Sequence, residues 1–361
     1  MRFDLIIPSY NNAATIGRLL EALDQGLAEG DRVLVVDDGS TDATPEIVAR
    51  MSASKRNQYI LFRQPHWGPA AARNEGMRRA SAEGILFLGA DIIPCPSLLA
   101  RHRAVHRAYP EETVGCAGFV TWDPSLPPTP LMVWLEHGGN QNAFGEIAGE
   151  EWIDPKTYCY GANLSLKHSL LQKVGGFDAV HFPSYGWEDL DLGIRLSHLG
   201  CRLRYEPAAR AWHAHPQTLS SVLARQRLLG PGAVTLQRLH PDIVRLPDGR
   251  RERFREFLRR VCFPAVIQGA LSSVAEKHLK SVMLPSVYQR LVSLVFTKSV
   301  QEARYLLPAV ETNPSLFSVT FRTLRGRIIA YQSHKKRMAR ERTFEVRQKD
   351  SQVIHKFVHK R

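Results

Sequence analysis

The sequence lacks the features that mark several common classes of protein. It has only five cysteines in 361 residues, widely spaced and without a CxxC pair, which argues against a disulfide framework or a zinc knuckle. No stretch reaches the roughly 18 uninterrupted apolar residues that a membrane-spanning helix requires, and the amino terminus carries no cleavable signal pattern. We therefore expect a cytoplasmic protein in a reducing compartment.

Acidic side chains are scarce in the last third of the chain. Residues 251–361 hold 23 lysines and arginines but 8 aspartates and glutamates, whereas residues 1–250 hold 25 and 27. The whole-chain charge of +13 therefore belongs to the C-terminal third. The first two thirds lack the basic patch of a nucleic-acid-binding protein, while the last third could meet anionic lipid, nucleic acid or an acidic partner.

Glycine-rich loops that cradle phosphates are missing as well. After the first apolar run, Leu5–Ile7, the chain reads PSYNN over residues 8–12. Neither GxGxxG nor GxxxxGKS/T occurs there, so a dinucleotide-binding fold and a P-loop enzyme are disfavoured. Acidic residues follow later apolar runs instead, which suggests that a metal ion neutralises the phosphates of a ligand.

Short apolar runs alternate with amphipathic segments through the first 120 residues. The runs predict buried parallel strands at Leu5–Ile7, Val33–Val36, Tyr59–Phe62 and Ile85–Leu88. Helical spacing predicts helices at Ile16–Leu23, Thr44–Met51 and Ala70–Ala80 between and after them. This alternation predicts a doubly wound α/β sheet with its ligand at the carboxyl ends of the strands.

The middle of the chain is less regular. Residues 121–160 contain several prolines and glycines and predict long loops over the site. We expect a strand at Tyr160–Leu166, a helix that opens near Tyr185 and ends at Leu199, a short strand at Arg202–Tyr205 and a further strand before Trp212.

Eight motifs then occur in a fixed order. They are PSYN at 8–11, VDDGSTD at 36–42, ARNEG at 72–76, FLGAD at 87–91, GAN at 161–163, GGFD at 175–178, EDLD at 188–191 and HAHP at 213–216. As a set they resemble the family 2 glycosyltransferases, inverting enzymes of the type that builds bacterial cell-surface polysaccharides and glycolipids. The resemblance implies a GT-A fold, with a Rossmann-like, mostly parallel sheet flanked by helices, over residues 1–235. Residues 236–361 lie outside it.

In similar enzymes an Asp-x-Asp motif after the fourth strand binds Mn²⁺ or Mg²⁺, which neutralises the departing diphosphate. Asp91 matches the last aspartate, Ala90 precedes it within the donor site, and Gly89 replaces the first aspartate. His213 resembles the late histidine that completes the metal shell, and His215 would share its face of a strand. The alternatives are a helix cap at Asp91 and a surface pair of histidines.

The resemblance also implies where a nucleotide-sugar donor binds. In similar enzymes an aspartate after the second strand accepts a hydrogen bond from the imide of uracil or thymine, so Asp37 and Asp38 are candidates for this contact. A UDP- or dTDP-sugar is therefore the favoured donor. Pro8 and Tyr10 would frame the base, and Arg73 would meet the base or the diphosphate. Asp38 could also form an Asx turn that caps the next helix.

The acceptor hydroxyl must lose a proton as it attacks, and a carboxylate at the start of a helix is a suitable base. The family resemblance assigns this role to Asp189, with Glu188 and Asp191 as the neighbours it could be confused with. Asp191 is expected to stabilise the helix N-terminus. Trp187 could stack on a sugar or anchor its loop, and Asn163 and Glu188 are further candidates for contacts with the sugars.

The basic C-terminal region, 236–361, has helical spacing, as at Phe254, Phe257, Leu258 and Val261. It could be a solvated helical surface, or a peripheral contact with anionic lipid on the inner face of the plasma membrane. The second option suits a glycan or lipid-linked acceptor. Nucleic acid is not favoured as a partner.

Two other functions compete with glycosyl transfer. A sugar nucleotidyltransferase shares the α/β architecture, but it needs a basic glycine-rich loop after the first strand, where this chain has PSYNN. A catalytically impaired binding protein of the same fold is favoured only by Gly89.

Overall fold

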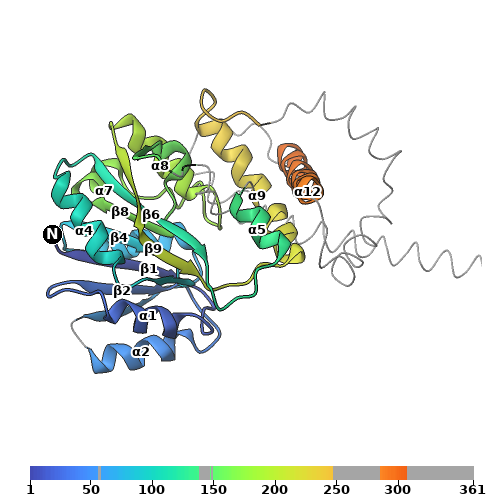
Figure 1. The fold of residues 1–361 in the computed structure, drawn as a ribbon. Coiled ribbons are helices and arrows are strands. Elements are labelled where there is room, and N and C mark those ends of the chain that lie inside the picture. Colours follow the sequence, from blue (N-terminus) through green and yellow to red (C-terminus); the bar gives the residue numbers. More distant parts are fainter. Residues whose placement is uncertain (56–57, 138–146, 148, 247–284, 307–361) are drawn as a thin grey trace, which may run out of the picture. The chain divides into compact units, whose positions relative to one another are not determined.

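A computed structural model of the chain describes residues 1–55, 58–137, 147, 149–246 and 285–306. These residues belong to one compact unit, Met1–Pro308. Its centre is a nine-stranded sheet with the strand order β3-β2-β1-β4-β8-β6-β9-β5, to which β7 is added by pairing with β9 (Figure 1).

One half of the sheet is parallel and matches the expected strands. It consists of β1 (Phe3–Ser9), β2 (Arg32–Asp37), β3 (Tyr59–Arg63) and β4 (Gly84–Leu88). The expected helices follow these strands as α1 (Ile16–Asp24), α2 (Thr44–Ser54) and α3 (Pro69–Arg79). The predicted strand residues in β1, β2 and β4 are buried, as parallel strands covered on both faces require, whereas in the edge strand β3 only Tyr59 is buried. The predicted α/β class with a Rossmann-like parallel portion is confirmed.

The other half is mixed. Its strands are β5 (Ile92–Pro94), β6 (Val114–Trp122), β7 (Trp152–Ile153), β8 (Asn163–Lys167) and β9 (Arg202–His213). β8 runs antiparallel to both β4 and β6, whereas β6 and β9 are parallel. The prediction of two separate strands within 202–212 was wrong. A register shift opposite Glu206–Arg210 accommodates Pro207, which cannot donate to a ladder, within one continuous strand.

The remaining helices are α4 (Leu98–Ala108), α5 (Pro130–His137), α6 (Pro155–Tyr158), α7 (His168–Val174), α8 (Glu188–His198), α9 (Leu219–Leu239) and α12 (Pro285–Leu306). The expectation of loops alone over 121–160 was wrong, because α5, β7 and α6 lie in this range. Pro130 and Pro155 are the first residues of their helices, a position where the missing N–H costs nothing.

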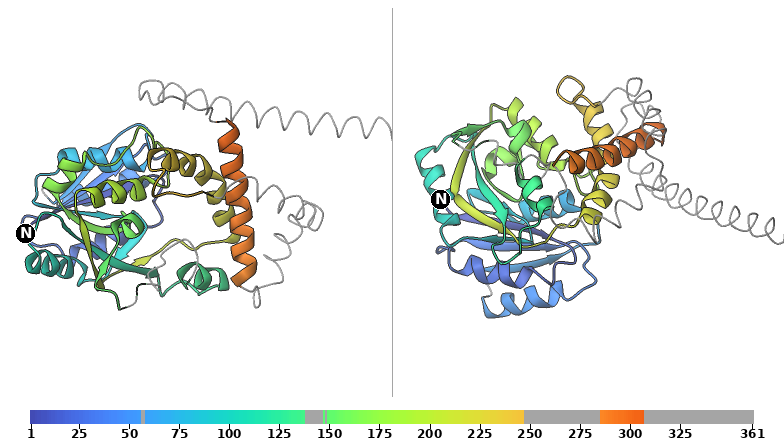
Figure 2. Two further views of the ribbon diagram at one scale, coloured as in Figure 1. Left: turned by 90° about the horizontal axis from the view of Figure 1, so that it is seen from above. Right: turned by 45° about the vertical axis from the view of Figure 1, so that its right-hand side comes forward.

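The C-terminal part of the compact unit is helical where the structure describes it. α9 and α12 lie side by side, and α12 also contacts α5 (Figure 2). α9 runs through the boundary proposed between 1–235 and 236–361, which stays a prediction. The predicted helical stripe at 254–261 lies outside the described residues, as do 247–284 and 307–361 of the basic region 236–361. In the described ranges, none of the helices is both long and apolar enough to cross a membrane.

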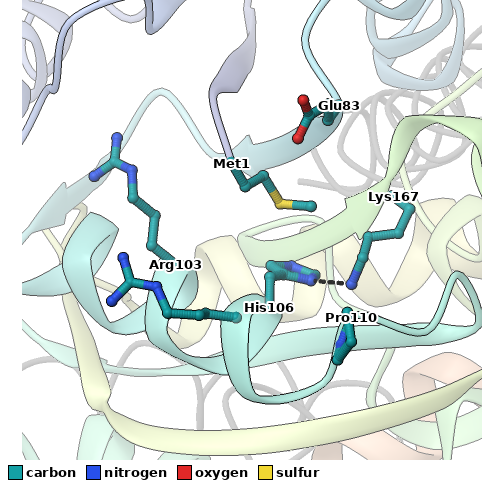
Figure 3. A pocket seen from close by; sticks show the side chains of 7 residues that line it. Met1, Glu83, Arg103, His106, Pro110 and Lys167 are labelled. Atoms are coloured by element: carbon teal, nitrogen blue, oxygen red, sulfur yellow. Dashed lines mark hydrogen bonds between the residues drawn. The ribbon is translucent and has the colours of Figure 1, made fainter.

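A buried chain of hydrogen bonds ties α4 to the sheet. It runs from Lys167 through His106, Ser165, His102 and Asn163 to the carbonyl of Ala209. The Lys167 ammonium can only donate, which sets the direction of every later bond. At its Lys167 end lies a cavity of about 290 Å³ (Figure 3). That cavity borders the amino ends of β1 and β4, opposite the edge where the predicted site lies.

Candidate active site

The carboxyl ends of the parallel strands bring the predicted site residues to one edge of the sheet. Ser9, the last residue of β1, lies opposite Asp37, the last residue of β2. β8 runs antiparallel to β4, so that its first residue, Asn163, lies opposite Leu88 at the end of β4. The segment before β8 therefore reaches the same edge, where ligands bind in open α/β sheets.

The two aspartates at the end of β2, Asp37 and Asp38, are buried beside the end of β3 and the loop that leads to α3. Asp37 accepts a hydrogen bond from Arg63 Nε at 3.0 Å. Asp38 accepts from the backbone N–H groups of Trp67 and Gly68 at 2.9 Å each. Asp38 therefore holds the loop that leads into α3, and not the start of α2 as the Asx-turn alternative predicted. A contact of either carboxylate with a nucleotide base stays a prediction.

An exposed aromatic pair lies beside these aspartates. The rings of Tyr10 and His66 stack with centroids 4.0 Å apart and planes at 24°. His66 is held in turn by Asp38, because its Nδ1 lies 2.8 Å from the carboxylate. Pro8, half-buried, pairs with Val36 at the ends of β1 and β2. The stacked rings of Tyr10 and His66 offer a flat face of the kind on which a nucleobase stacks.

Asp91 and His213 face each other at the end of the mixed part of the sheet. Asp91 Oδ2 lies 3.4 Å from His213 Nε2, and the pairing of Ile92 with His213 between β5 and β9 sets this approach. His213 Nδ1 donates to the carbonyl of His215 at 3.1 Å, so in the neutral ring Nε2 carries a lone pair. Burial lowers the pKa of His213 and favours this neutral form, although the Asp91 charge opposes the shift. Two acceptors that face each other fit a cation between them.

This pair suits a cation that takes its other ligands from substrate phosphates and water, as Mg²⁺ and Mn²⁺ commonly do. Over the ranges the structure describes, no cluster of three or more His, Cys, Asp or Glu could hold a metal by itself. His215 is exposed, and its carbonyl orients His213, so the geometry favours His213 as the ligand. At Gly89 a Cβ atom would lie 3.0 Å from Asp91 Oδ1, so the glycine leaves room for this carboxylate.

A second cluster joins α3 to the start of α8. Arg73 Nη1 lies 3.1 Å from Glu188 Oε1 and 3.8 Å from Asp189 Oδ1. The Arg73 and Glu188 side chains are 9% and 3% exposed, whereas that of Asp189 is 23% exposed. Burial and the charge of Asp189 raise the pKa of Glu188. For Arg73, burial lowers the pKa, but the charges of Asp189 and Glu188 outweigh it, so the pKa of Arg73 is raised. Asp189 is therefore the carboxylate of this cluster that an acceptor can reach.

The segment before β8 closes over this cluster. The backbone N–H of Gly161 donates to Asp189 Oδ2 at 3.0 Å. A Cβ atom at Gly161 would lie 2.9 Å from Asp189 Oδ1 and 3.0 Å from Arg73 Nε. Both of these atoms are buried and have no hydrogen-bond partner in the described part of the chain. Gly161 therefore lets the peptide approach the carboxylate closely and orients it.

Arg73 and Asn163 are both more enclosed than their motifs indicate. The guanidinium of Arg73 pairs with Glu188 and lies over the Phe177 ring, 5.2 Å from its centroid, so it belongs to the carboxylate cluster. Its contact with the base or the diphosphate stays a prediction. Asn163 is 2% exposed and its amide bonds with His102 and Ala209 inside the sheet, away from an acceptor or donor sugar. Local motifs do not report such burial.

Trp187 and Asp191 support the helix that carries Asp189. The Trp187 indole donates to the carbonyl of Leu229 at 2.8 Å, as the loop-anchor alternative predicts. Asp191 is buried and pairs with Arg195 at 2.7 Å and His240 at 2.8 Å, which connects the first turn of α8 to the end of α9.

Sequence reasoning missed Arg225 on α9. Its Nη2 donates to Gln217 Oε1 at 3.3 Å. Its positive charge adds to the burial that lowers the pKa of His213, and it partly offsets the burial that raises the pKa of Tyr185. A cation here could meet the departing diphosphate. Its place on the helix directly after the HAHP motif is the signal that could have found it.

Comparison with known proteins gives the family. The sequence model described as "Glycosyl transferase family 2" matches residues 4–174. Glycosyltransferase AglE of Haloferax volcanii is 37% identical over 237 residues, which cover 64% of this chain and 72% of that protein. The pre-mycofactocin glycosyltransferase of Mycobacterium tuberculosis is 32% identical over 252 residues, 66% of this chain and 48% of that protein. The chain thus spans about half the length of the mycobacterial relative.

The fold has a solved counterpart. The mannosyltransferase PcManGT from Pyrobaculum calidifontis, in complex with GDP-Man and Mn²⁺, matches with a TM-score of 0.50 and 19% sequence identity. The match covers 83% of this chain and 85% of that one, and it agrees with the GT-A fold that the motifs imply. The ordered motifs, the fold and these relatives together show that the chain belongs to glycosyl transferase family 2.

Proposed function

We propose that this protein is an inverting glycosyltransferase that moves a sugar from a nucleoside-diphosphate sugar to an acceptor hydroxyl. The observation that carries the proposal is the oriented, partly exposed carboxylate of Asp189, on the same sheet edge as the facing pair Asp91 and His213. One cluster supplies a base, and the other supplies ligands for a cation on a diphosphate. A UDP- or dTDP-sugar is the favoured donor.

The reaction is a single in-line displacement. The acceptor oxygen attacks the anomeric carbon, the bond from that carbon to the diphosphate oxygen breaks, and the hydroxyl proton passes to Asp189. Gly161 orients the Asp189 carboxylate, and Arg73 compensates the adjacent charge of Glu188. One displacement inverts the configuration at the anomeric carbon.

Asp91 and His213 would hold Mn²⁺ or Mg²⁺, which supplies charge neutralisation for the departing diphosphate when bound. The His215 carbonyl keeps His213 in the tautomer that a metal requires. Arg225 lies near enough to act electrostatically on His213, and it would stabilise the same developing charge.

The acceptor is proposed to be a glycan or lipid-linked glycan, reached from the inner face of a membrane. The support is the basic C-terminal third of the sequence, whose side chains would be attracted to anionic headgroups. Flotation with anionic vesicles would compare the full chain with one that ends at Pro308, the limit of the compact unit. Equal flotation of both chains would contradict a contact through residues 309–361.

A thermal-shift screen tests the proposed function directly. UDP-, dTDP- and GDP-sugars are added to the full chain with and without Mn²⁺, and the stabilising donor is then assayed for transfer. We expect one class of donor to raise the melting temperature, with a larger shift when Mn²⁺ is present. If no nucleotide sugar stabilises the protein under either condition, the proposed function is wrong.

A further inference from the structure

The segment that precedes Asp189 has an uncommon backbone conformation. Gly186 and Trp187 both have positive φ angles, 106° and 77°. A positive φ is costly for a bulky residue such as tryptophan, and it persists only when neighbouring structure holds it in place. The neighbouring structure is α9. Leu229 accepts the indole N–H, and at Gly232 a Cβ atom would lie 2.6 Å from Trp187 Cδ1.

α9 itself contains an internal proline, Pro231. Proline has no N–H, so the carbonyl of Arg227, four residues earlier, loses its helical partner. Ser299 on α12 replaces that partner, because its Oγ donates to the Arg227 carbonyl at 2.6 Å. The adjacent Gly230 allows the close approach, since a Cβ atom there would lie 2.4 Å from the Ser299 carbonyl carbon. α12 therefore docks at the interruption in α9.

The same face of α12 also reaches the segment directly. Phe296 lies three residues before Ser299, so the two side chains share one side of the helix. The rings of Phe296 and Trp187 have centroids 6.0 Å apart, within the range of favourable aromatic pairs. At its other end α12 packs on α5, where the ring centroids of Tyr288 and Trp134 are 5.6 Å apart.

We propose that α12 is a positioning element of the transferase: Ser299 and Phe296 hold α9 and Trp187 in the arrangement that places Asp189 for proton abstraction. This role rests on the proposed function. It assigns a catalytic task to a helix that lies far outside residues 4–174, which match the family. The sheet-edge part of the donor site, Asp37, Asp91 and His213, would depend on α12 less, because strand pairing between β1 and β2 and between β5 and β9 places it.

The kinetic test compares Ser299→Ala and Phe296→Leu with Ser293→Ala in the full chain. Ser293 is the matched control, since it lies on α12, where its Oγ accepts from the exposed Gln289 at 3.2 Å and makes no other side-chain hydrogen bond within the described residues. We expect both test variants to lower kcat by about 10-fold or more, because small displacements of a catalytic group are costly, while the donor KM changes less than about 2-fold. Unchanged kcat in both variants, or a loss equal to that of Ser293→Ala, would overturn the proposal.

Hydrogen exchange gives a readout that does not need activity. In both test variants the amides of residues 186–190 should exchange about 10-fold faster, while those of β1, β2 and β4 keep their rates. Adding Pro231→Ala to Ser299→Ala restores an N–H for the Arg227 carbonyl and should recover part of the protection. If exchange rises evenly over the chain, or 186–190 is unaffected, α12 is not a positioning element. The two ideas fail separately: a thermal-shift screen in which no donor binds rejects the proposed function, whereas the exchange rates of 186–190 test the role of α12 without any donor.

Discussion

The two clusters of the site are held in different ways. Asp91 and His213 belong to paired strands and their ends, so backbone ladders between β5 and β9 place them. Arg73 and Asp189 belong to helices, and side-chain contacts from α3, α8 and α9 place them. The donor half of the site, Asp91 and His213, is therefore set by sheet register, whereas the proton-acceptor or base half, Arg73, Glu188 and Asp189, depends on packing from distant parts of the chain.

The two halves also differ in how exposed their charged side chains are and in what compensates those charges. Asp91 is 31% exposed and faces a neutral histidine, so the donor half is open to a cation and its ligands. Glu188 and Arg73 are nearly enclosed, so the base half compensates its charges internally. We therefore expect changes in the donor half to affect binding, and changes in the base half to affect turnover or stability.

The largest expected effect is on turnover in the base half. Asp189→Asn removes the proton acceptor while keeping the size of the side chain and the bond from Gly161. We expect kcat to fall by roughly 10²–10⁴-fold, the usual contribution of general-base catalysis. Initial rates at saturating donor measure this, and a variant that kept most of its transfer rate would remove Asp189 from the base role.

The next effect is on stability in the base half. Arg73→Met leaves two adjacent carboxylates, one of them buried, without their cation. Breaking a buried pair in this way costs about 3–5 kcal/mol of unfolding free energy. Chemical denaturation measures the change. Arg78→Met on the same helix is the control, because its exposed pairing with Glu75 is worth less than about 1 kcal/mol. Equal losses in the two variants would show that Arg73 is not a buried counter-charge.

Low pH should destabilise the fold through the two buried histidines of α4, which pack on the sheet that carries both halves of the site. Burial lowers the pKa of His102 to about 4 and that of His106 to about 3, so both are neutral in the folded chain near pH 5. The unfolded chain, with histidine pKa values near 6.5, then binds more protons. Stability therefore falls as the pH drops from about 6.5 toward 4, by on the order of a few kcal/mol. Denaturation at pH 7 and pH 5 measures this, and His102→Gln should flatten the dependence. A variant with the same slope as the native chain would contradict this assignment.

The smallest expected effect is that of a substitution at Gly89, which replaces the first aspartate of the Asp-x-Asp motif. Gly89→Asp restores the missing aspartate, but its Cβ would lie 2.9 Å from Ile92 Cγ1 and 3.0 Å from Asp91 Oδ1. We expect about 1 kcal/mol of lost stability from overpacking and no tighter binding of Mn²⁺. Metal titration followed by melting temperature tests this. Clearly tighter binding would show that the glycine weakens the metal site.

The sequence predicted the donor half better than the base half for a physical reason. The strands β1 to β4 and their helices have strong local periodicity, and the motifs at the ends of β2 and β4 contain Asp37 and Asp91, while His213 was found from its HAHP motif alone. β6, which contains two glycines among its first five residues, gave no such signal, and Pro207 made β9 look like two strands. The burial of Asn163, the pairing of Arg73 and the contact of Ser299 with α9 arise from residues about 60 to over 100 positions apart. No local pattern reports such contacts.

Donor binding by two variants tests the central claim most directly. The melting temperatures of Asp189→Asn and His213→Ala are measured with Mn²⁺ and the nucleotide sugar that stabilises the native chain. If the halves are separate, Asp189→Asn keeps the native stabilisation and loses turnover, whereas His213→Ala loses the part of the stabilisation that depends on Mn²⁺. Loss of donor binding in Asp189→Asn, or native metal-dependent stabilisation in His213→Ala, would contradict the account.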